Sequence, residues 1–267
     1  MAVAAGLHWE VSGPEDGAPL LLSSGLGGSA SYWGPNLSAL AATHRVITYD
    51  HRGTGRSDRA LPVSVKVDDL AGDMMAVLDA AGAGKASVLG HAAGGIAALA
   101  LALNAPDRVD RLVIVNGWSR PDPHFLRCFE TRLALLRKAG TEAYLRAQPI
   151  FLYPANWISA HHAELEAELP HQMAQFPGAE TMEKRIAALA AFDIDARLNE
   201  IDAPALVVTS RDDILVPSSA GDRLAYGLPN ALKLEFESGG HACNVTEAQE
   251  FNRIIPAWLA GERRKES

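Results

Sequence analysis

Apolar and polar positions along the chain follow two alternating periods, which predict strands and helices in turn. Short apolar runs bounded by turn-forming residues are typical of buried strands, and they cover residues 7–11, 20–22, 45–49, 88–90, 111–115, 205–209 and 232–236. Segments with apolar residues three or four positions apart are typical of helices, and they cover residues 35–41, 65–81, 96–103, 248–259 and a stretch from about 218. This alternation predicts an α/β fold, in which helices flank a mostly parallel, twisted sheet.

Two of the predicted helices carry clear end signals. The helix over 65–81 is followed by Gly82, which is typical of a helix end. The last helix, over 248–259, contains Pro256. Because proline lacks an N–H group and its ring clashes with the preceding turn, Pro256 predicts a kink or an early end.

The pattern changes between residues 119 and 191. This segment has no β-branched runs, several helical stretches, and six prolines. We therefore expect an inserted helical cap over 119–191, and an α/β core formed by 1–118 and 192–267.

Composition narrows the function classes. Apolar residues make up 48% and charged residues 21%, as in soluble globular proteins, and the net charge of -8 disfavours nucleic acid as a partner. The two cysteines lack the spacing of a metal site, and no segment is typical of a leader peptide or a membrane span. These features predict a cytoplasmic protein that does not bind membranes. The one basic run, Arg263-Arg264-Lys265, is expected to be a solvated tail.

One stretch has the pattern of the strand, turn and helix that present a catalytic nucleophile. Residues 88–95 run from a strand pattern through small residues into a helical pattern, with the spacing Gly90-X-Ala92-X-Gly94. In the spacing Gly-X-Ser-X-Gly, a serine nucleophile stands on a sharp turn between a strand and a helix. Here alanine occupies the serine position.

Further candidate residues follow other strands. Ser24-Gly25-Leu26-Gly27-Gly28 follows the strand at 20–22, and Asp212 and Asp213 follow the strand at 205–209. His241, after two glycines, follows the strand at 232–236. An aspartate after a strand is commonly a helix cap, but nucleophile position, acid and histidine in this order predict a shared site. Asp50 and Arg52, in the turn after the strand at 45–49, are expected to hold their own loop together.

Together these motifs resemble the α/β-hydrolase superfamily. A narrower resemblance is to the aminoacrylate hydrolases of the Rut pyrimidine-degradation pathway, also named carbamate hydrolases. It depends on Asn116-Gly117-Trp118, on the run from Gln148 to Trp157, and on the run from Gly239 to Thr246. The first resemblance implies the α/β-hydrolase fold, and the second implies a substrate class.

The resemblance also implies roles for single residues. Asp213 would orient His241, which would act as acid or base, and Asp212 stays open as a rival. The amides of Leu26 and Ala93 would form the oxyanion hole and hold the substrate carboxylate. The residues expected to contact the substrate, for which core packing is the alternative, are Gly25, Asn116, Trp118, Phe151, Tyr153 and Trp157. No cofactor and no metal are expected, because adjacent His161 and His162 point to different sides of a helix.

The alanine limits the reaction. Hydrolysis through an acyl-enzyme needs the serine, and its removal typically costs about a million-fold in turnover. The reaction that the resemblance implies is easier: aminoacrylate, a small anion, adds water and loses ammonia to give malonic semialdehyde in uracil catabolism. His241 would assist the addition of water without a covalent intermediate.

Two alternatives to this reaction stay open. The chain is a serine hydrolase inactivated by an engineered change from Ser to Ala92, or it is a non-catalytic protein that binds small molecules. Retention of both Asp213 and His241 argues against a pure binding protein, which has no need of an oriented imidazole. A homodimer is compatible with the sequence.

Overall fold

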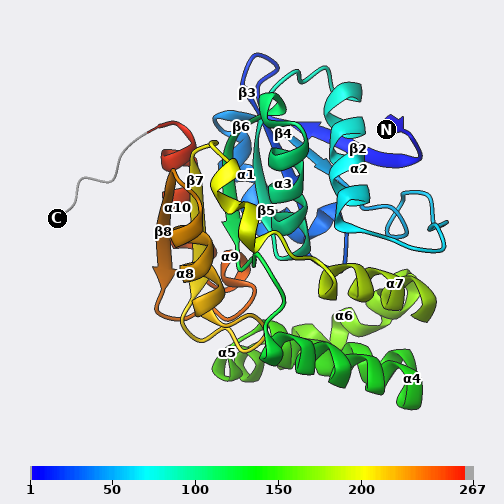
Figure 1. Cartoon of the computed structure of the whole chain (residues 1–267). Coiled ribbons are helices and arrows are strands. Elements are labelled where there is room, and N and C mark those ends of the chain that lie inside the picture. The colour runs from blue at the N-terminus through cyan, green and yellow to red at the C-terminus, as the bar shows by residue number, and fades with distance from the viewer. Residues whose placement is uncertain (1, 262–267) are drawn as a thin grey trace.

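The computed structural model describes residues 2–261 and shows an eight-stranded sheet between two layers of helices (Figure 1). The basic run at 263–265 lies outside the described residues. The strands are β1 (Ala2–Ala4), β2 (Leu7–Ser12), β3 (Ala18–Ser23), β4 (His44–Tyr49), β5 (Ala86–His91), β6 (Val109–Val115), β7 (Ala205–Ser210) and β8 (Ala231–Phe236). Their order across the sheet is β1-β2-β4-β3-β5-β6-β7-β8.

All pairs from β4 to β8 are parallel, and only β1–β2 and β2–β4 are antiparallel. The predicted fold class is therefore confirmed. The three-residue strand β1 was not predicted. It turns into β2 through Ala5 and Gly6, which both adopt positive φ angles of 50° and 79°.

Helices pack on both faces of the sheet. They are α1 (Gly34–Ala41), α2 (Val67–Ala80), α3 (Ala93–Asn104), α4 (Pro123–Leu152), α5 (Ala155–Ala160), α6 (His162–Gln175), α7 (Ala179–Ala190), α8 (Ser218–Gly227), α9 (Cys243–Thr246) and α10 (Ala248–Leu259), with short 3-10 turns at Ala30–Trp33, Pro106–Arg108 and Asp195–Glu200. Successive residues of a strand point to opposite faces, so Leu21 packs in the α2–α3 layer while Leu20 and Leu22 pack in the α1–α10 layer.

Helix α3 is buried on nearly every side. Its residues from Ala93 to Ala102 are all buried, as expected for a helix that is apolar all round. It follows β5 directly and fixes the turn at Ala92 in the centre of the molecule.

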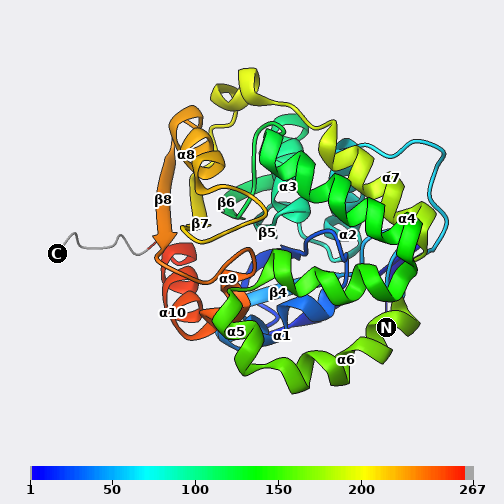
Figure 2. The ribbon, with the colours of Figure 1, turned by 90° about the horizontal axis from the view of Figure 1, so that it is seen from below.

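Helices α4 to α7 form a cap between β6 and β7. Figures 1 and 2 show the cap across the end of the core at which the parallel strands terminate. Helix α4 changes direction at Gly140, whose φ of 86° and ψ of -178° are not helical. The cap thus covers the strand ends that carry the predicted site.

The early helix end predicted at Pro256 is wrong. Helix α10 continues through Pro256 to Leu259, and Phe251, Ile255 and Leu259 are buried against the sheet. Proline removes one backbone hydrogen bond near the end of this helix, whereas the apolar stripe on both sides of it stays buried. Burial of the stripe therefore decides where the helix ends.

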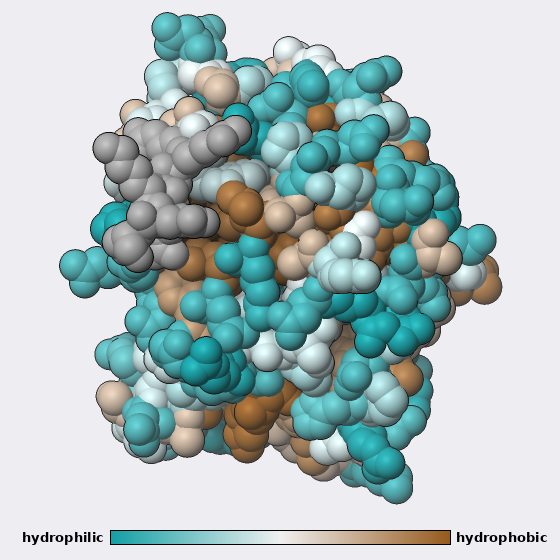
Figure 3. Space-filling view, turned by 60° about the vertical axis from the view of Figure 1, so that its left-hand side comes forward, coloured by the Kyte–Doolittle hydropathy of each residue, from teal (hydrophilic) through white to brown (hydrophobic). Residues whose placement is uncertain are grey.

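The outer surface is largely polar. Hydrophilic side chains cover most of the face in Figure 3, and hydrophobic residues are exposed there in smaller groups. Among the described residues, no helix combines the length and the apolar character needed to cross a membrane.

Substitution of Gly94 should disrupt the packing of α3. A Cβ atom at Gly94 would lie 2.2 Å from the carbonyl oxygen of Ser23, which is backbone and cannot rotate away. Gly94→Ala should lower the free energy of unfolding by more than about 2 kcal/mol, measured by urea denaturation. The matched control is Gly72→Ala in α2, where a Cβ meets no atom within 4 Å and should stabilise the helix by about 0.5–1 kcal/mol. Equal stability of both variants would contradict this account.

Candidate active site

The predicted site residues meet at one edge of the sheet. Parallel strands place their carboxyl ends together, and ligands of such sheets bind outside these ends. The loops after β3, β5, β6, β7 and β8 supply Leu26, Ala92, Asn116, Asp213 and His241. The cap helices lie over this edge (Figure 2).

The turn at Ala92 has the strained form of a nucleophile elbow. Its φ of 47° and ψ of -108° are rare for a residue with a side chain. The Ala92 amide donates to the carbonyl of Val115 at 2.8 Å, and a Cβ at Gly90 would lie 2.5 Å from the backbone of Gly94. Glycines therefore permit the close turn. The turn places the methyl group of Ala92 at the position that a nucleophile occupies in a serine hydrolase.

His241 and Asp213 form a buried pair. Nδ1 of His241 lies 2.8 Å from Oδ2 of Asp213, and because a carboxylate accepts, Nδ1 carries the proton. The other oxygen, Oδ1 of Asp213, accepts from the amides of Leu215 and Val216 at 2.8 and 2.9 Å. In neutral His241, Nε2 therefore carries the free lone pair. This nitrogen has no hydrogen-bond partner among the described side chains and backbone groups. This arrangement prepares His241 to take or give a proton.

The rival acid, Asp212, has a different position. Its carboxylate accepts from the amides of Gly240 at 2.9 Å and Gly239 at 3.3 Å. It shapes the turn that presents His241, and the structure places Asp213 on the imidazole.

Two buried side chains hold the carbonyl of His241. Nδ2 of Asn116 donates to it at 2.7 Å, and Oδ1 of Asn116 accepts from the amide of Ser210. Nε2 of His91 also lies 2.8 Å from this carbonyl and must donate to it. Asn116 thus positions the turn that carries His241, and its expected contact with the substrate stays a prediction.

The sequence analysis missed His91, which stands beside the elbow. Its ring centroid lies 4.7 Å from that of His241. Burial, together with the nearby His241, lowers the pKa of His91 to about 3. His91 is therefore neutral at physiological pH.

The glycine-rich loop after β3 lies against the start of α3. A Cβ at Gly25 would lie 2.8 Å from Nδ1 of His91 and 3.8 Å from the Cβ of Ala92. Within the described part of the chain, the amides of Leu26 and Ala93 donate to no other group. Both expected oxyanion-hole donors are thus free, on loops that touch each other.

The other expected contact residues lie around this edge. Trp118 is buried against Phe125, and its Nε1 has no hydrogen-bond partner among the described residues. Tyr153 lines a surface cleft together with Asp212. Trp157 stacks on His161, with ring centroids 3.9 Å apart.

No cysteine replaces the missing serine. Cys243 lies two residues after His241, but burial raises the pKa of its thiol to about 12. A thiol with this pKa stays protonated and is a poor nucleophile. Cys243 is a packing residue of the turn.

Arg185 of α7 ties the cap to the loops of the core, and the sequence analysis missed it. It donates to the carbonyls of Leu26 at 3.1 Å and Arg52 at 3.2 Å, and to Nδ1 of His51 at 2.9 Å. Burial lowers the pKa of Arg185 to about 10, so it remains charged at neutral pH. Arg185 therefore helps to hold the Leu26 loop in place.

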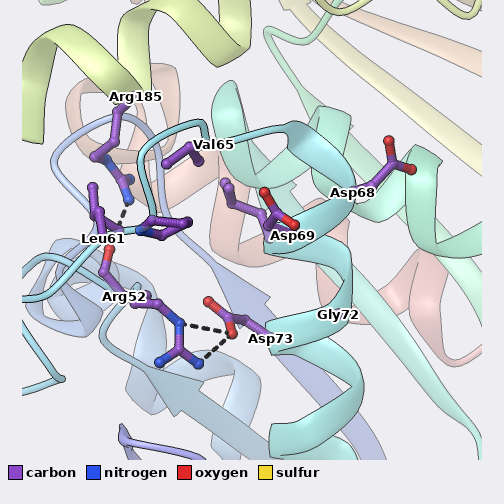
Figure 4. Close-up of a pocket in the computed structure, with 10 residues that line it drawn as sticks. Arg52, Leu61, Val65, Asp68, Asp69, Gly72, Asp73 and Arg185 are labelled. Carbon is purple, nitrogen blue, oxygen red and sulfur yellow. Dashed lines mark hydrogen bonds and ion pairs between the residues drawn. The ribbon is translucent and has the colours of Figure 1, made fainter.

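Asp50 and Arg52 hold their loop, as expected. Asp50 accepts from the amide of Ala30 at 2.8 Å and from the side chain of Arg56 at 2.9 Å. Figure 4 shows Arg52 reaching Asp73 on α2, beside the cleft that Arg185 also lines. Neither residue reaches the His241 edge.

Comparisons with known proteins agree with this geometry. A family model described as "alpha/beta hydrolase fold" matches residues 18–248. A Caulobacter segnis protein named "Putative carbamate hydrolase RutD" is 58% identical over 254 residues, covering 95% of this chain and 94% of that protein. A Variovorax paradoxus protein of the same name is 52% identical over 255 residues, covering 95% and 96%. The crystal structure of the enol-lactonase from Burkholderia xenovorans LB400 has a TM-score of 0.85 at 25% identity, and covers 97% of this chain and 99% of that one. The expected resemblance is confirmed.

The strain at Ala92 should be measurable. Because glycine adopts positive φ without a steric penalty, Ala92→Gly should raise the free energy of unfolding by about 1 kcal/mol. The control is Ala98→Gly inside α3, which should lower it by a similar amount or more. Urea denaturation compares the two, and a destabilised Ala92→Gly variant would show that the turn is not strained.

Proposed function

The chain belongs to the alpha/beta hydrolase fold family and is a hydrolase, and on this premise we propose that it converts aminoacrylate and water into malonic semialdehyde and ammonia. The relatives named RutD support a substrate of this kind, because the carbamate in their name is also a small anion with a carbon–nitrogen bond. The proposed reaction breaks such a bond and belongs to pyrimidine degradation.

One observation carries the proposal: an oriented His241–Asp213 pair stands beside an elbow that has no nucleophile. The pair is joined at 2.8 Å, and Ala92 offers only a methyl group. General acid or base catalysis alone accelerates reactions by about a hundred- to ten-thousand-fold. This range suits a substrate that already decays in water, and it does not suit a stable amide or ester.

The reaction balances without a covalent enzyme intermediate. A proton added to the carbon next to the carboxylate, with loss of a proton from the nitrogen, converts the enamine into an imine. Water then adds to the imine carbon, and the carbinolamine formed in this way expels ammonia. His241 supplies a proton or removes one through Nε2, and Asp213 keeps Nδ1 protonated throughout.

The amides of Leu26 and Ala93 bind an anionic oxygen in this proposal. Both are without acceptors in the described structure, and Ala93 begins a helix of 12 residues whose positive end favours anions. The missing hydroxyl of residue 92 leaves room for the water that adds. The alanine thus favours addition of water over acyl transfer.

The alternative of an inactivated serine hydrolase has one observation in its favour. The turn at Ala92 keeps the strained φ of 47° that presents a serine in such enzymes. A binding protein without catalysis would not use a free Nε2 on His241.

The first test follows aminoacrylate, generated in situ, by NMR. We expect the protein to accelerate ammonia release over buffer, and His241→Ala to abolish this acceleration because the proton carrier is lost. The control is His162→Ala, which removes an exposed histidine on α6 and should leave the rate unchanged. A rate equal to that of buffer with the unaltered protein would refute the reaction, and a ligand bound tightly and released unchanged would support a binding protein.

The second test restores the hydroxyl with Ala92→Ser. We expect this variant to lose ammonia release from aminoacrylate at least in part, because the hydroxyl takes the place of the water. Hydrolysis of an activated ester is measured in parallel, with Ala98→Ser in α3 as the control. A covalent burst and strong esterase activity in Ala92→Ser would favour the inactivated serine hydrolase instead.

A further inference from the structure

Arg132 of α4 is a buried cation with an incomplete set of partners. The residue is only 3% exposed, and its one hydrogen bond within the described part of the chain runs from Nη2 to the hydroxyl of Tyr144 at 2.8 Å. Its Nε is buried and has no acceptor among the described residues. Within residues 2–261, no carboxylate lies within ion-pair distance of Arg132.

Aromatic rings surround the guanidinium but do not replace an anion. Its Cζ lies 5.6 Å from the ring centre of Phe129, 5.2 Å from that of Tyr144 and 5.6 Å from that of Phe151. Attraction between a cation and an aromatic ring is weaker than the hydration that a buried ion loses. The site therefore stabilises the charge only in part.

Arg132 lies beside the turn that carries His241. Its neighbour Phe151 precedes Leu152, whose carbonyl accepts from the amide of Ala242 at 3.0 Å. Cys128, one turn before Arg132 on α4, lies 3.6 Å from the carbonyl of Ile214. Arg132 is thus connected to both of the loops that hold the His241–Asp213 pair through its neighbours Phe151 and Cys128.

The same side chain lies close to the Leu26 loop. Tyr144, which accepts from Arg132, belongs to a buried cluster with Leu136, and Leu26 packs against this cluster. Side chains that contact Arg132 therefore belong to segments that reach both the loop of the expected oxyanion hole and the turn of His241.

The second buried arginine under the cap, Arg185, does not share this character. Each of its three hydrogen bonds ends on an acceptor of the core, two carbonyls and one imidazole. Its task of holding the Leu26 loop is complete without a ligand. Of these two arginines, only Arg132 has a buried N–H group without an acceptor among the described residues.

We propose that Arg132 binds the carboxylate of the substrate and makes the site selective for carboxylates over neutral molecules. The inference depends on the proposed function, in that the substrate is a small carboxylate. A guanidinium–carboxylate contact is charge-assisted and stronger than contacts to neutral amides. The amides of Leu26 and Ala93 are then available to the oxygen that adds to carbon, instead of the carboxylate that we first expected there.

The test compares two unreactive probes of equal size, propionate and propionamide, by ligand-observed NMR titration. The protein should bind propionate and discriminate against propionamide by about tenfold or more. Arg132→Gln should weaken propionate binding by about 10- to 100-fold and leave propionamide unchanged. The matched control is Arg146→Gln, which removes an exposed arginine of the same helix and should bind propionate as the unaltered protein does. Equal binding of propionate by both variants would overturn the proposal.

A second variant and a second measurement separate binding from folding. Arg132→Lys keeps the charge and should retain selectivity for propionate, and propionate should raise the unfolding temperature of the unaltered protein and of Arg146→Gln but not of Arg132→Gln. The role of the charge would be contradicted if Arg132→Lys lost selectivity for propionate and propionate still raised the unfolding temperature of Arg132→Gln. If propionate selectivity depends on Arg132 but the protein does not accelerate ammonia release from aminoacrylate, the proposed reaction fails and this inference stands. If the protein accelerates ammonia release but propionate selectivity does not depend on Arg132, only this inference is rejected.

Discussion

The structure depends on one close backbone contact, between the start of α3 and the loop after β3. The Cα of Gly94 comes so near to the carbonyl of Ser23 that a methyl group cannot fit between them. This contact brings the Leu26 loop to the start of α3, where the Ala93 amide has no acceptor among the described residues. The strained turn at Ala92, the free amides and the position of His91 beside Gly25 all follow from the same approach.

Most of the fold could be predicted because its strands are short apolar runs with clear boundaries. The run at 205–209, for example, became β7 with one further residue. The errors have physical causes. Strand β1 has three residues and depends on pairing with β2, which no local pattern reports. Pro256 is a local signal against a helix, but burial of Ile255 before it and Leu259 after it outweighs this signal.

The site could be predicted as far as chain order allows. Asp213 and His241 follow neighbouring parallel strands, so their meeting at 2.8 Å follows from topology. Arg132 and Arg185 could not be assigned, because their partners come from distant loops. Each nevertheless interrupts the apolar stripe of an amphipathic helix, and this pattern could have marked them as buried cations. For Asn116 the residue was found but its partner, a carbonyl, was not.

The contacts of Arg185 have a consequence for how the cap responds to ionic strength. Ion pairs on the cap surface, such as Arg146 with Glu166 and Arg137 with Glu183, are exposed and are screened by salt. Arg185 instead is itself buried and bonds backbone carbonyls, so salt screens these contacts much less. In concentrated salt the outer cap helices should therefore exchange their amide hydrogens faster, while α7 around Arg185 stays protected. The hydrogen bonds of Arg185 to backbone carbonyls attach the cap to the core, whereas the ion pairs lie on its surface. The contact between the cap and the Leu26 loop should therefore change little with salt concentration.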